Sequence, residues 1–362
     1  MAPRLIRDLV GIGMILTLSG FQAHSSVTFI TRVGEIKDRR RTMTVHQAKY
    51  RTELPQLGSE FFLTDGGLET TLIFREGIEL LYFAAFDLLK EPSGEAALRD
   101  YFHAYAAIAV RDKVGLVLDS ATWRADADWG AKLGYSTDAL AEANQKSIGL
   151  LEDVRGKFEN GQTKVVISGC IGPRGDGYNP SLQMSTGEAE RYHTAQVETF
   201  KDTAADLVTA LTMNYEEEAI GVVHAAKAAG MPVVISFTVE TDGRLPTRQS
   251  LRSAVEAVDA ATDGGPVYYM INCAHPEHFE AVLAANEPWV TRIRGVRANA
   301  SRMSHAELDE ADALDDGNPS ELGQQYALLK KRLGHLNVLG GCCGTDHRHI
   351  EQISVACTPL FV

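Results

Sequence analysis

Basic residues are too few in this 362-residue chain to form a surface that binds nucleic acid or an anionic membrane. Lys and Arg number 35 against 48 Asp and Glu, which gives a formal net charge of −13 at pH 7. Both polyanionic partners require concentrated positive charge. We therefore expect no nucleic-acid and no membrane partner, and a small molecule becomes the expected ligand.

Cysteine is also scarce. The chain has five cysteines, an odd count without the regular spacing of a small disulfide-bonded domain. A secreted disulfide framework is therefore disfavoured. Reduced thiols in the cytoplasm are the expected state.

A membrane-spanning run is lacking at the N-terminus. The apolar stretch 9–18 is too short to cross a bilayer as a helix. With the small residues at 23–25 it resembles a signal peptide, but the basic, unpatterned segment 39–43 favours a dispensable extension, and its Met43 is an alternative start. We assign residues 1–57 to an extension outside the fold and 58–362 to one domain.

Eight short apolar runs alternate with longer amphipathic stretches from residue 61 onward. This alternation is typical of parallel strands joined by helical crossovers. The number and spacing of the runs match a (β/α)8 TIM barrel, which typically has about 250 residues. The expected strands are Phe61–Asp65, Gly115–Ser120, Lys164–Cys170, Asp206–Met213, Pro232–Val239, Val267–Cys273, Arg292–Asn299 and Asn337–Gly341.

Helices are predicted between these strands. A doubly wound open sheet is the alternative fold, but it usually carries a glycine-rich nucleotide turn after the first strand. The turn here, from Asp65 to Glu69, lacks a third glycine, so the barrel is favoured. The expected helices are Asp138–Phe158, Glu216–Ala229, Ser250–Ala261 and Ser320–Leu333, with two more starting at an N-cap Ser93 and near Asp346.

Three cysteines lie at the carboxyl ends of expected strands: Cys273 at the sixth, and the adjacent Cys342 and Cys343 at the eighth. In a barrel these ends share one mouth, where functional groups gather. Next-but-one strands lie roughly 10 Å apart, so inward-leaning cysteines can meet at one ion with Zn–S bonds of about 2.3 Å. The glycines that flank the pair allow the backbone to turn both sulfurs inward. Three soft thiolates and one open position predict a catalytic zinc site.

Structural roles for cysteines and histidines are the alternatives. A lone strand cysteine is usually a small core residue, and this is the role expected of Cys170 and Cys357. A vicinal disulfide is the main alternative for the adjacent pair. Four histidines near the same rim are alternative ligands, and the last two diverge at a helix start, which favours the surface: His275, His278, His347 and His349.

Four motifs point to a known family: Asp65-Gly-Gly-Leu-Glu-Thr70, Ile171-Gly-Pro173, Ile271-Asn-Cys273 and Gly340-Gly-Cys-Cys-Gly-Thr345. Together they resemble the homocysteine S-methyltransferase family, which includes the betaine- and S-methylmethionine-homocysteine methyltransferases. The resemblance covers about residues 61–357. It implies a zinc barrel whose Asp-Gly-Gly turn helps to seat the amino-acid substrate.

The expected site combines this resemblance with the strand ends. Cys273, Cys342 and Cys343 are the expected Zn²⁺ ligands and catalytic residues, and the resemblance implies the same three ligands. The expected substrate-binding residues are Asp65, Gly66, Gly67, Glu69 and Asn299.

One position departs from the family pattern. After the fourth strand, family members commonly carry a glutamate whose carboxylate binds the substrate amine, whereas this chain has Leu211. Either another acid, such as Glu216, Glu217 or Glu240, binds the ammonium group, or the acceptor is not homocysteine.

The expected reaction transfers a methyl group from an onium-type donor to a thiol, with homocysteine as the leading acceptor and methionine as the product. The thiolate is the nucleophile, and zinc coordination deprotonates a thiol. Attack then needs in-line placement in a water-poor pocket rather than a general base. Five aromatic residues are candidates for cation–π contact with the donor: Phe74, Tyr82, Phe83, Trp123 and Trp129.

Two other classes of function are alternatives. A metal-dependent hydrolase is disfavoured because it would use His and carboxylate ligands. A non-catalytic, zinc-stabilised barrel that binds an amino acid is compatible with Leu211. The methyl donor and the oligomeric state stay open.

Overall fold

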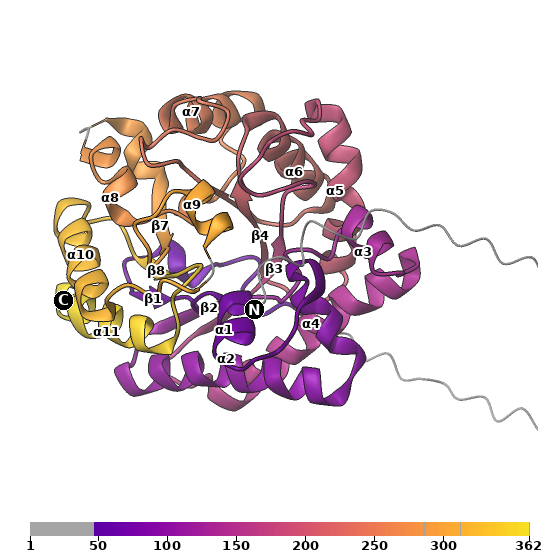
Figure 1. The fold of residues 1–362 in the computed structure, drawn as a ribbon, viewed down its shortest axis with the longest axis horizontal. Coiled ribbons are helices and arrows are strands. Elements are labelled where there is room, and N and C mark those ends of the chain that lie inside the picture. The colour runs from indigo at the N-terminus through magenta and orange to yellow at the C-terminus, as the bar shows by residue number, and fades with distance from the viewer. Residues whose placement is uncertain (1–46, 285–286, 312, 362) are drawn as a thin grey trace, which may run out of the picture. The chain divides into compact units, whose positions relative to one another are not determined.

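Eight parallel strands form a closed barrel in a computed structural model that describes residues 47–284, 287–311 and 313–361. The strands follow one another in chain order around the barrel (Figure 1). The expected TIM barrel is therefore confirmed. The strands are β1 (Phe62–Leu63), β2 (Gly115–Asp119), β3 (Val165–Ile171), β4 (Leu207–Met213), β5 (Val233–Phe237), β6 (Tyr268–Asn272), β7 (Ile293–Ala298) and β8 (Val338–Gly341).

The strands are mostly apolar because both of their faces are covered. All residues of β2, β3, β4, β5 and β6 are buried. This is the pattern of a parallel sheet with side chains filling one face and helices packed on the other. The barrel closes between β1 and β8, where Phe62 lies opposite Val338 and Leu63 opposite Leu339.

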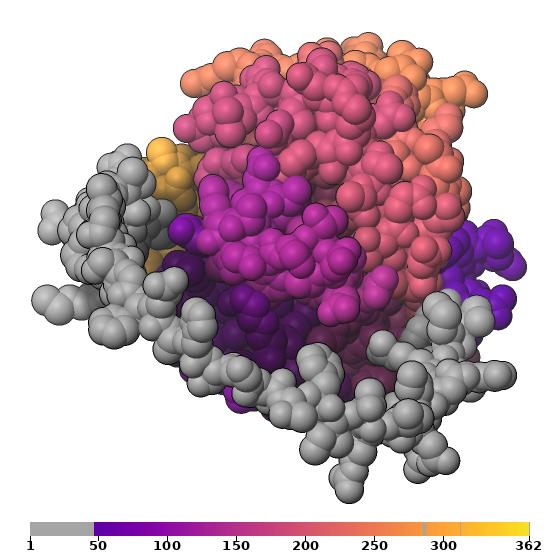
Figure 2. Space-filling model, turned by 90° about the vertical axis from the view of Figure 1, so that its right-hand side faces the viewer, coloured from indigo at the N-terminus to yellow at the C-terminus, as the bar shows by residue number. Residues whose placement is uncertain are grey.

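Helices surround the strands, as Figure 1 shows, and Figure 2 shows one side of this layer, with the magenta segment around α3 and α4 beside the pink segment that contains α5. Four expected helices are present with ends shifted by one residue at most. The helices are α1 (Leu68–Phe74), α2 (Pro92–Asp112), α3 (Ala127–Lys132), α4 (Thr137–Phe158), α5 (Thr186–Lys201), α6 (Glu216–Ala229), α7 (Leu251–Thr262), α8 (Pro276–Phe279), α9 (His305–Glu310), α10 (Pro319–Arg332) and α11 (His347–Cys357).

The sequence prediction omits several helices and misplaces one cap, since α1, α3, α5, α8 and α9 were not among the expected helices. Helix α5 was not expected, because its buried face includes the polar His193 and Gln196 and therefore gives a weak apolar period. Ser93 is not an N-cap: α2 begins one residue earlier at Pro92, and Glu91 precedes it without a side-chain cap. Proline suits the first helical position because it has no N–H to satisfy there.

The ordered fold begins before the expected residue 58. Leu54 and Gln56 are buried at 6% and 0% exposure, and Leu54 packs with Phe62 and other side chains inside the barrel. Arg51 donates hydrogen bonds to the carbonyl oxygens of residues 201, 203 and 205, just before β4. Residues 47–57 thus close the amino-terminal end of the barrel. The rest of the expected extension, 1–46, lies outside the described residues.

Within the described ranges, every helix falls short of either the length or the apolar character that a bilayer crossing requires.

Candidate metal centre

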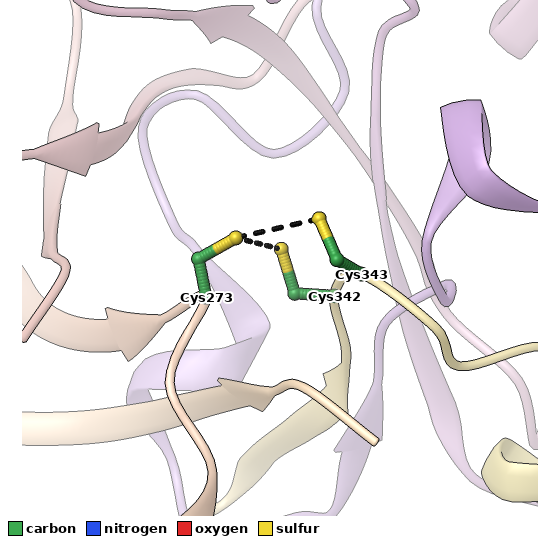
Figure 3. Close-up of side chains that lie close together, drawn as sticks. All are labelled: Cys273, Cys342 and Cys343. Carbon is green, nitrogen blue, oxygen red and sulfur yellow. Dashed lines mark hydrogen bonds between the residues drawn. The ribbon is translucent and has the colours of Figure 1, made fainter. Parts of the chain in front are cut away.

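Cys273 follows directly after β6, at the mouth of the barrel. Its φ is +58°, a left-handed conformation that residues with a β-carbon rarely adopt. The backbone is held there by a hydrogen bond from the Cys273 N–H to the Arg297 carbonyl oxygen at 3.1 Å. The Cys273 side chain is 4% exposed and points toward the carboxyl end of β8 (Figure 3).

Cys342 and Cys343 follow β8, and the loop that carries them is fixed on both sides. The Cys342 N–H donates to the Ala298 carbonyl oxygen at 2.8 Å, and the Cys343 carbonyl oxygen accepts from the Ala300 N–H at 3.1 Å. Gly344, with φ at +80°, provides the turn that the adjacent pair needs. Both cysteines are half-buried, and both are free thiols rather than a vicinal disulfide.

The three sulfur atoms meet at one point, as Figure 3 shows. Cys273 Sγ lies 3.2 Å from Cys342 Sγ and 3.5 Å from Cys343 Sγ, and all three lie within 4.8 Å of one another. A tetrahedral site with bonds of about 2.3 Å places its sulfurs about 3.8 Å apart. The donor set therefore fits a thiophilic metal ion, and it is the one such group of three ligands that the described residues form.

A buried arginine lies beneath this cluster and was not predicted from the sequence. Arg297, on β7, donates through Nη2 to Asp65 Oδ1 at 2.6 Å and through Nη1 to Asp119 Oδ2 at 2.5 Å. Its Nε donates to the carbonyl oxygen of Gly341, the residue before Cys342. The pKa of the Cys342 thiol is lowered chiefly by hydrogen bonding from the thiols of Cys273 and Cys343, with a further contribution from the Arg297 charge.

Asparagine 272 orients the same region. Its Nδ2 donates to Thr212 Oγ1 at 2.8 Å, and its Oδ1 accepts from the Thr212 N–H at 2.8 Å and from Ser236 Oγ at 2.6 Å. These bonds hold Thr212 at φ +63°, where β4 is irregular. The Asn272 amide also lies 3.9 Å from Cys342 Sγ, so one residue links β4, β5 and the cysteine loop.

Tyr178, on the loop between β3 and α5, covers the cluster and was also missed. Its hydroxyl lies 2.9 Å from Cys273 Sγ and 3.8 Å from Cys343 Sγ. Its ring stacks on His305 at a centroid distance of 3.9 Å. The His305 Nε2 lies 2.8 Å from the Cys273 carbonyl oxygen, and its Nδ1 lies 3.2 Å from Glu240 Oε1. A sequence offers no periodic signal for contacts between loops of this kind.

The two glycines expected to bind substrate lie against the cysteine loop. A β-carbon on Gly67 would stand 2.6 Å from the Cys342 carbonyl oxygen, and one on Gly66 would stand 3.0 Å from the Thr345 carbonyl oxygen. The Gly67 N–H donates to that same Thr345 oxygen at 3.0 Å. Their contacts with the chain thus position the cysteine loop, while a contact with substrate stays a prediction.

The other expected substrate residues line the same mouth. Both oxygens of Asp65 are engaged, one by Arg297 and the other by the Tyr101 hydroxyl at 3.1 Å. Asn299 is 2% exposed, and its Oδ1 finds no donor among the described residues. Glu69 is half-buried, and burial raises its pKa to about 7, with the neighbouring Cys342 and Asp65 adding to the rise.

Position 211, near the end of β4, is a leucine and therefore provides no carboxylate. Leu211 is 8% exposed, and its carbonyl oxygen accepts from Trp123 Nε1 at 3.4 Å. Among the acids considered as replacements, Glu240 contacts His305 and Glu216 accepts from the Gln249 side chain. Neither is held against the three sulfurs by a described contact.

The remaining cysteines and histidines have structural surroundings. Cys170 and Cys357 are buried at 3% and 0% exposure, as expected of core residues. His275 caps α8 through Nδ1. The expectation for His349 is wrong: it is fully buried at the third position of α11, where it contacts the capping residue Asp346, whereas His347 is exposed as predicted. A capping box turns the third helical residue back toward the helix start.

The candidate donor aromatics already contact cations of the chain. The Arg124 guanidinium lies 4.1 Å from the ring centroids of both Trp123 and Trp129, and Lys132 Nζ lies 3.6 Å from that of Trp129. Tyr82 is 43% exposed, and its ring lies 5.8 Å from that of Trp129. Cations of the chain therefore occupy part of the faces of Trp123 and Trp129. This leaves less ring surface for a cation–π contact with an onium donor than the sequence suggests.

The structure is a closed parallel barrel with three free thiols at its carboxyl-terminal mouth. Barrel enzymes carry their active sites at this mouth, and thiols are common metal ligands. The family model described as homocysteine S-methyltransferase matches residues 62–357. The chain therefore belongs to the homocysteine S-methyltransferase family and is an enzyme of that family. No protein in the comparison with curated proteins matches this chain.

Solved structures support the fold assignment. The oxidized form of the homocysteine methyltransferase MmuM from Escherichia coli superposes with a TM-score of 0.68 at 19% identity. Its metallated form superposes with a TM-score of 0.65 at 20% identity. Each match covers 82% of this chain and 96% of the MmuM chain. The shared barrel thus spans almost the whole of that protein.

Proposed function

We propose that this protein is a zinc-dependent S-methyltransferase that moves a methyl group from an onium donor to a thiol acceptor, with homocysteine as the leading acceptor. The observation that carries the proposal is the meeting of the Cys273, Cys342 and Cys343 sulfurs at distances of 3.2 and 3.5 Å. Family membership over residues 62–357 supports the reaction type. A metallated form of MmuM supports a metal at such a site in this family.

Zinc is the ion that three thiolates favour among common divalent metals, and it leaves a fourth position open. The chemistry it supplies is to keep a bound substrate thiol ionised at neutral pH. A hydrolase is less well supported, because no histidine or carboxylate joins the three sulfurs in the described cluster.

The chain's own residues then position the reactants. The substrate sulfur forms a bond to the donor methyl carbon, and the bond between that carbon and the onium atom breaks with its electron pair staying on the donor. In-line placement and exclusion of water are the main requirements for this step. Tyr178 shields the cluster from solvent, and Arg297 maintains positive charge beneath Cys342.

An ammonium group on the acceptor needs oxygen acceptors in the mouth. Both oxygens of Asp65 are used by Arg297 and Tyr101. Asp119 Oδ1 and Asn299 Oδ1 are buried and lack a donor in the described part of the chain. We assign ammonium recognition to these two oxygens, because a buried acceptor without a donor is costly unless a ligand satisfies it.

Five free cysteines support a reducing compartment such as the cytoplasm. A small-molecule thiol and a small-molecule methyl donor are the proposed partners.

Metal content and product formation test the proposal. Purified protein is expected to hold about one zinc per chain by elemental mass spectrometry, and Cys342→Ala is expected to lose most of it. Cys170→Ala, a buried cysteine outside the cluster, is the matched control and is expected to keep its zinc.

Betaine, S-methylmethionine and S-adenosylmethionine are then supplied as donors with homocysteine, and methionine is measured by mass spectrometry. Zinc retained by Cys342→Ala, or a zinc-loaded chain that methylates no thiol with any donor, would contradict the proposal.

A further inference from the structure

Arg124 is a buried cation beside the mouth of the barrel. It follows β2, is 7% exposed, and is held between two indole rings, with its guanidinium 4.1 Å from the ring centroids of Trp123 and Trp129. The rings shield it from water and fix its plane. A guanidinium in such a position presents its N–H groups along one edge.

This cation lacks a carboxylate partner. In the described ranges Arg124 forms no ion pair, and its one hydrogen bond joins Nη1 to the Gly175 carbonyl oxygen at 2.6 Å. Its Nε is buried and finds no partner among the residues that the structure describes. The other deeply buried arginines differ: Arg297 contacts two aspartates, and Arg155 pairs with Asp206. Burial lowers the pKa of Arg124, and the charges of Asp176, Asp126 and Glu69 offset part of this effect without forming an ion pair with it in the described ranges. A buried charge is normally paired, so the open N–H edge of the guanidinium points to an anion from outside the chain.

One loop links Arg124 to the sulfur cluster. The loop that it holds at Gly175 continues to Tyr178, whose hydroxyl is 2.9 Å from Cys273 Sγ. Arg124 and the thiols therefore lie at the same mouth of the barrel, on the loops that follow β2, β6 and β8.

We propose that Arg124 binds the carboxylate of a substrate whose reacting atom lies at the three sulfurs. The inference rests on the proposed function and deepens it by assigning a residue that orients one of the two substrates through its carboxylate. A planar guanidinium matches a carboxylate with two parallel hydrogen bonds, which gives both affinity and orientation.

A purely structural role predicts something different. Arg124 could be needed only to hold the Gly175 loop, or the half-buried Glu69 could turn to pair with it. In either case, substitution lowers activity toward every substrate to the same degree. Selectivity for a carboxylate, rather than total activity, is therefore the decisive measurement.

The experiment compares substrates with and without a carboxylate on the zinc-loaded full chain. Homocysteine is paired with 3-aminopropane-1-thiol, and S-methylmethionine with its decarboxylated sulfonium analogue. The proteins are wild type, Arg124→Gln, Arg124→Lys and the control Arg174→Gln, which alters a half-exposed arginine already paired with Asp128.

For one of the two pairs, the preference in kcat/KM for the carboxylate-bearing member is expected to fall about 10- to 100-fold in Arg124→Gln. Partial recovery is expected in Arg124→Lys and no change in Arg174→Gln. The pair that responds tells whether the acceptor or the donor carries the bound carboxylate. Equal losses for both members of each pair would overturn the proposal.

Calorimetry keeps the test independent of turnover and of the variants' folding. Homocysteine and 3-aminopropane-1-thiol, and then the two sulfoniums, are titrated into zinc-loaded wild-type protein. Binding of at least one pair with a preference of about tenfold or more for the carboxylate supports the role of Arg124. Equal affinities within both pairs overturn this inference but leave the methyltransferase proposal standing. If no thiol binds at all, the proposed function itself fails.

Discussion

At the scale of single residues, Arg297 organises the floor of the candidate site. Its guanidinium joins Asp65 of the first turn, Asp119 at the end of β2 and the carbonyl oxygen of Gly341 before the cysteine loop. It is 4% exposed, and the two carboxylates are equally buried. Each charge is therefore stable in the interior only because the others are there.

Replacing Arg297 with methionine is expected to lower the free energy of unfolding by about 3–5 kcal/mol, because it leaves two buried carboxylates without a cationic partner. Urea denaturation measures the change. Arg292→Met is the control: this arginine pairs with Asp259 at a half-exposed position, and its loss is expected to cost about 1 kcal/mol or less. Equal effects of the two substitutions would show that the buried triad contributes no more than a surface pair.

At the scale of elements, the turn after β1 and the loop after β8 form one unit. The Gly341 N–H donates to the Asp65 carbonyl oxygen at 2.9 Å, and the Gly67 N–H donates to the Thr345 carbonyl oxygen at 3.0 Å. The close approach of Gly67 to the Cys342 backbone leaves no room for a side chain. The geometry of two of the clustered cysteines therefore depends on a turn in a different part of the sequence.

Gly67→Ala is expected to displace the Cys342 backbone and to weaken zinc binding about 10- to 100-fold, as substitutions around metal ligands typically do. Competition with a chromogenic chelator measures the affinity. Gly149→Ala, in the middle of α4 with open space around its α-carbon, is the control and is expected to leave zinc binding unchanged. Unchanged affinity in Gly67→Ala would mean that the turn adapts without moving the ligand.

The elements that could be predicted are those with a strong local signal. Helix α6 begins and ends where the sequence predicts, because three glutamates start it and Gly230 ends it in a left-handed conformation. Helix α5 was missed because His193 and Gln196 belong to its buried face. The three cysteines could be predicted because parallel strands place their carboxyl ends together.

Arg124, Tyr178 and Arg297 could not be predicted in the same way. Their partners lie 51, 95 and 232 positions away in the chain, at Gly175, Cys273 and Asp65. No local period records which side chain on one loop contacts which atom on another. Such contacts follow from the barrel register, which becomes known only with the fold.

At the scale of the whole molecule, the barrel is closed at its amino-terminal end by residues 47–57. Leu54 enters the barrel core, and the Asn337 side chain donates to the carbonyl oxygens of Gln56 and Glu60, both at 2.9 Å. The opposite end carries the candidate site. The segment that closes the barrel and the candidate site thus lie at opposite ends, as is usual for this fold.

Two shortened chains test this closure. A chain that begins at residue 58 is expected to be less stable by about 3 kcal/mol or more than one that begins at residue 46, because it loses the burial of Leu54 and the hydrogen bonds of Arg51. Thermal and urea unfolding followed by circular dichroism give the difference. Indistinguishable curves would assign residues 47–57 no part in holding the barrel together.

The left-handed backbone at Cys273 has a consequence for any attempt to improve this protein. Glycine adopts such a φ freely, whereas a residue with a β-carbon carries a penalty of about 1–2 kcal/mol. Selection for thermal stability is therefore expected to favour glycine at position 273, and each such variant loses the Cys273 thiol. A stabilised variant that keeps the thiol cluster must retain Cys273 and gain its stability from substitutions elsewhere in the barrel.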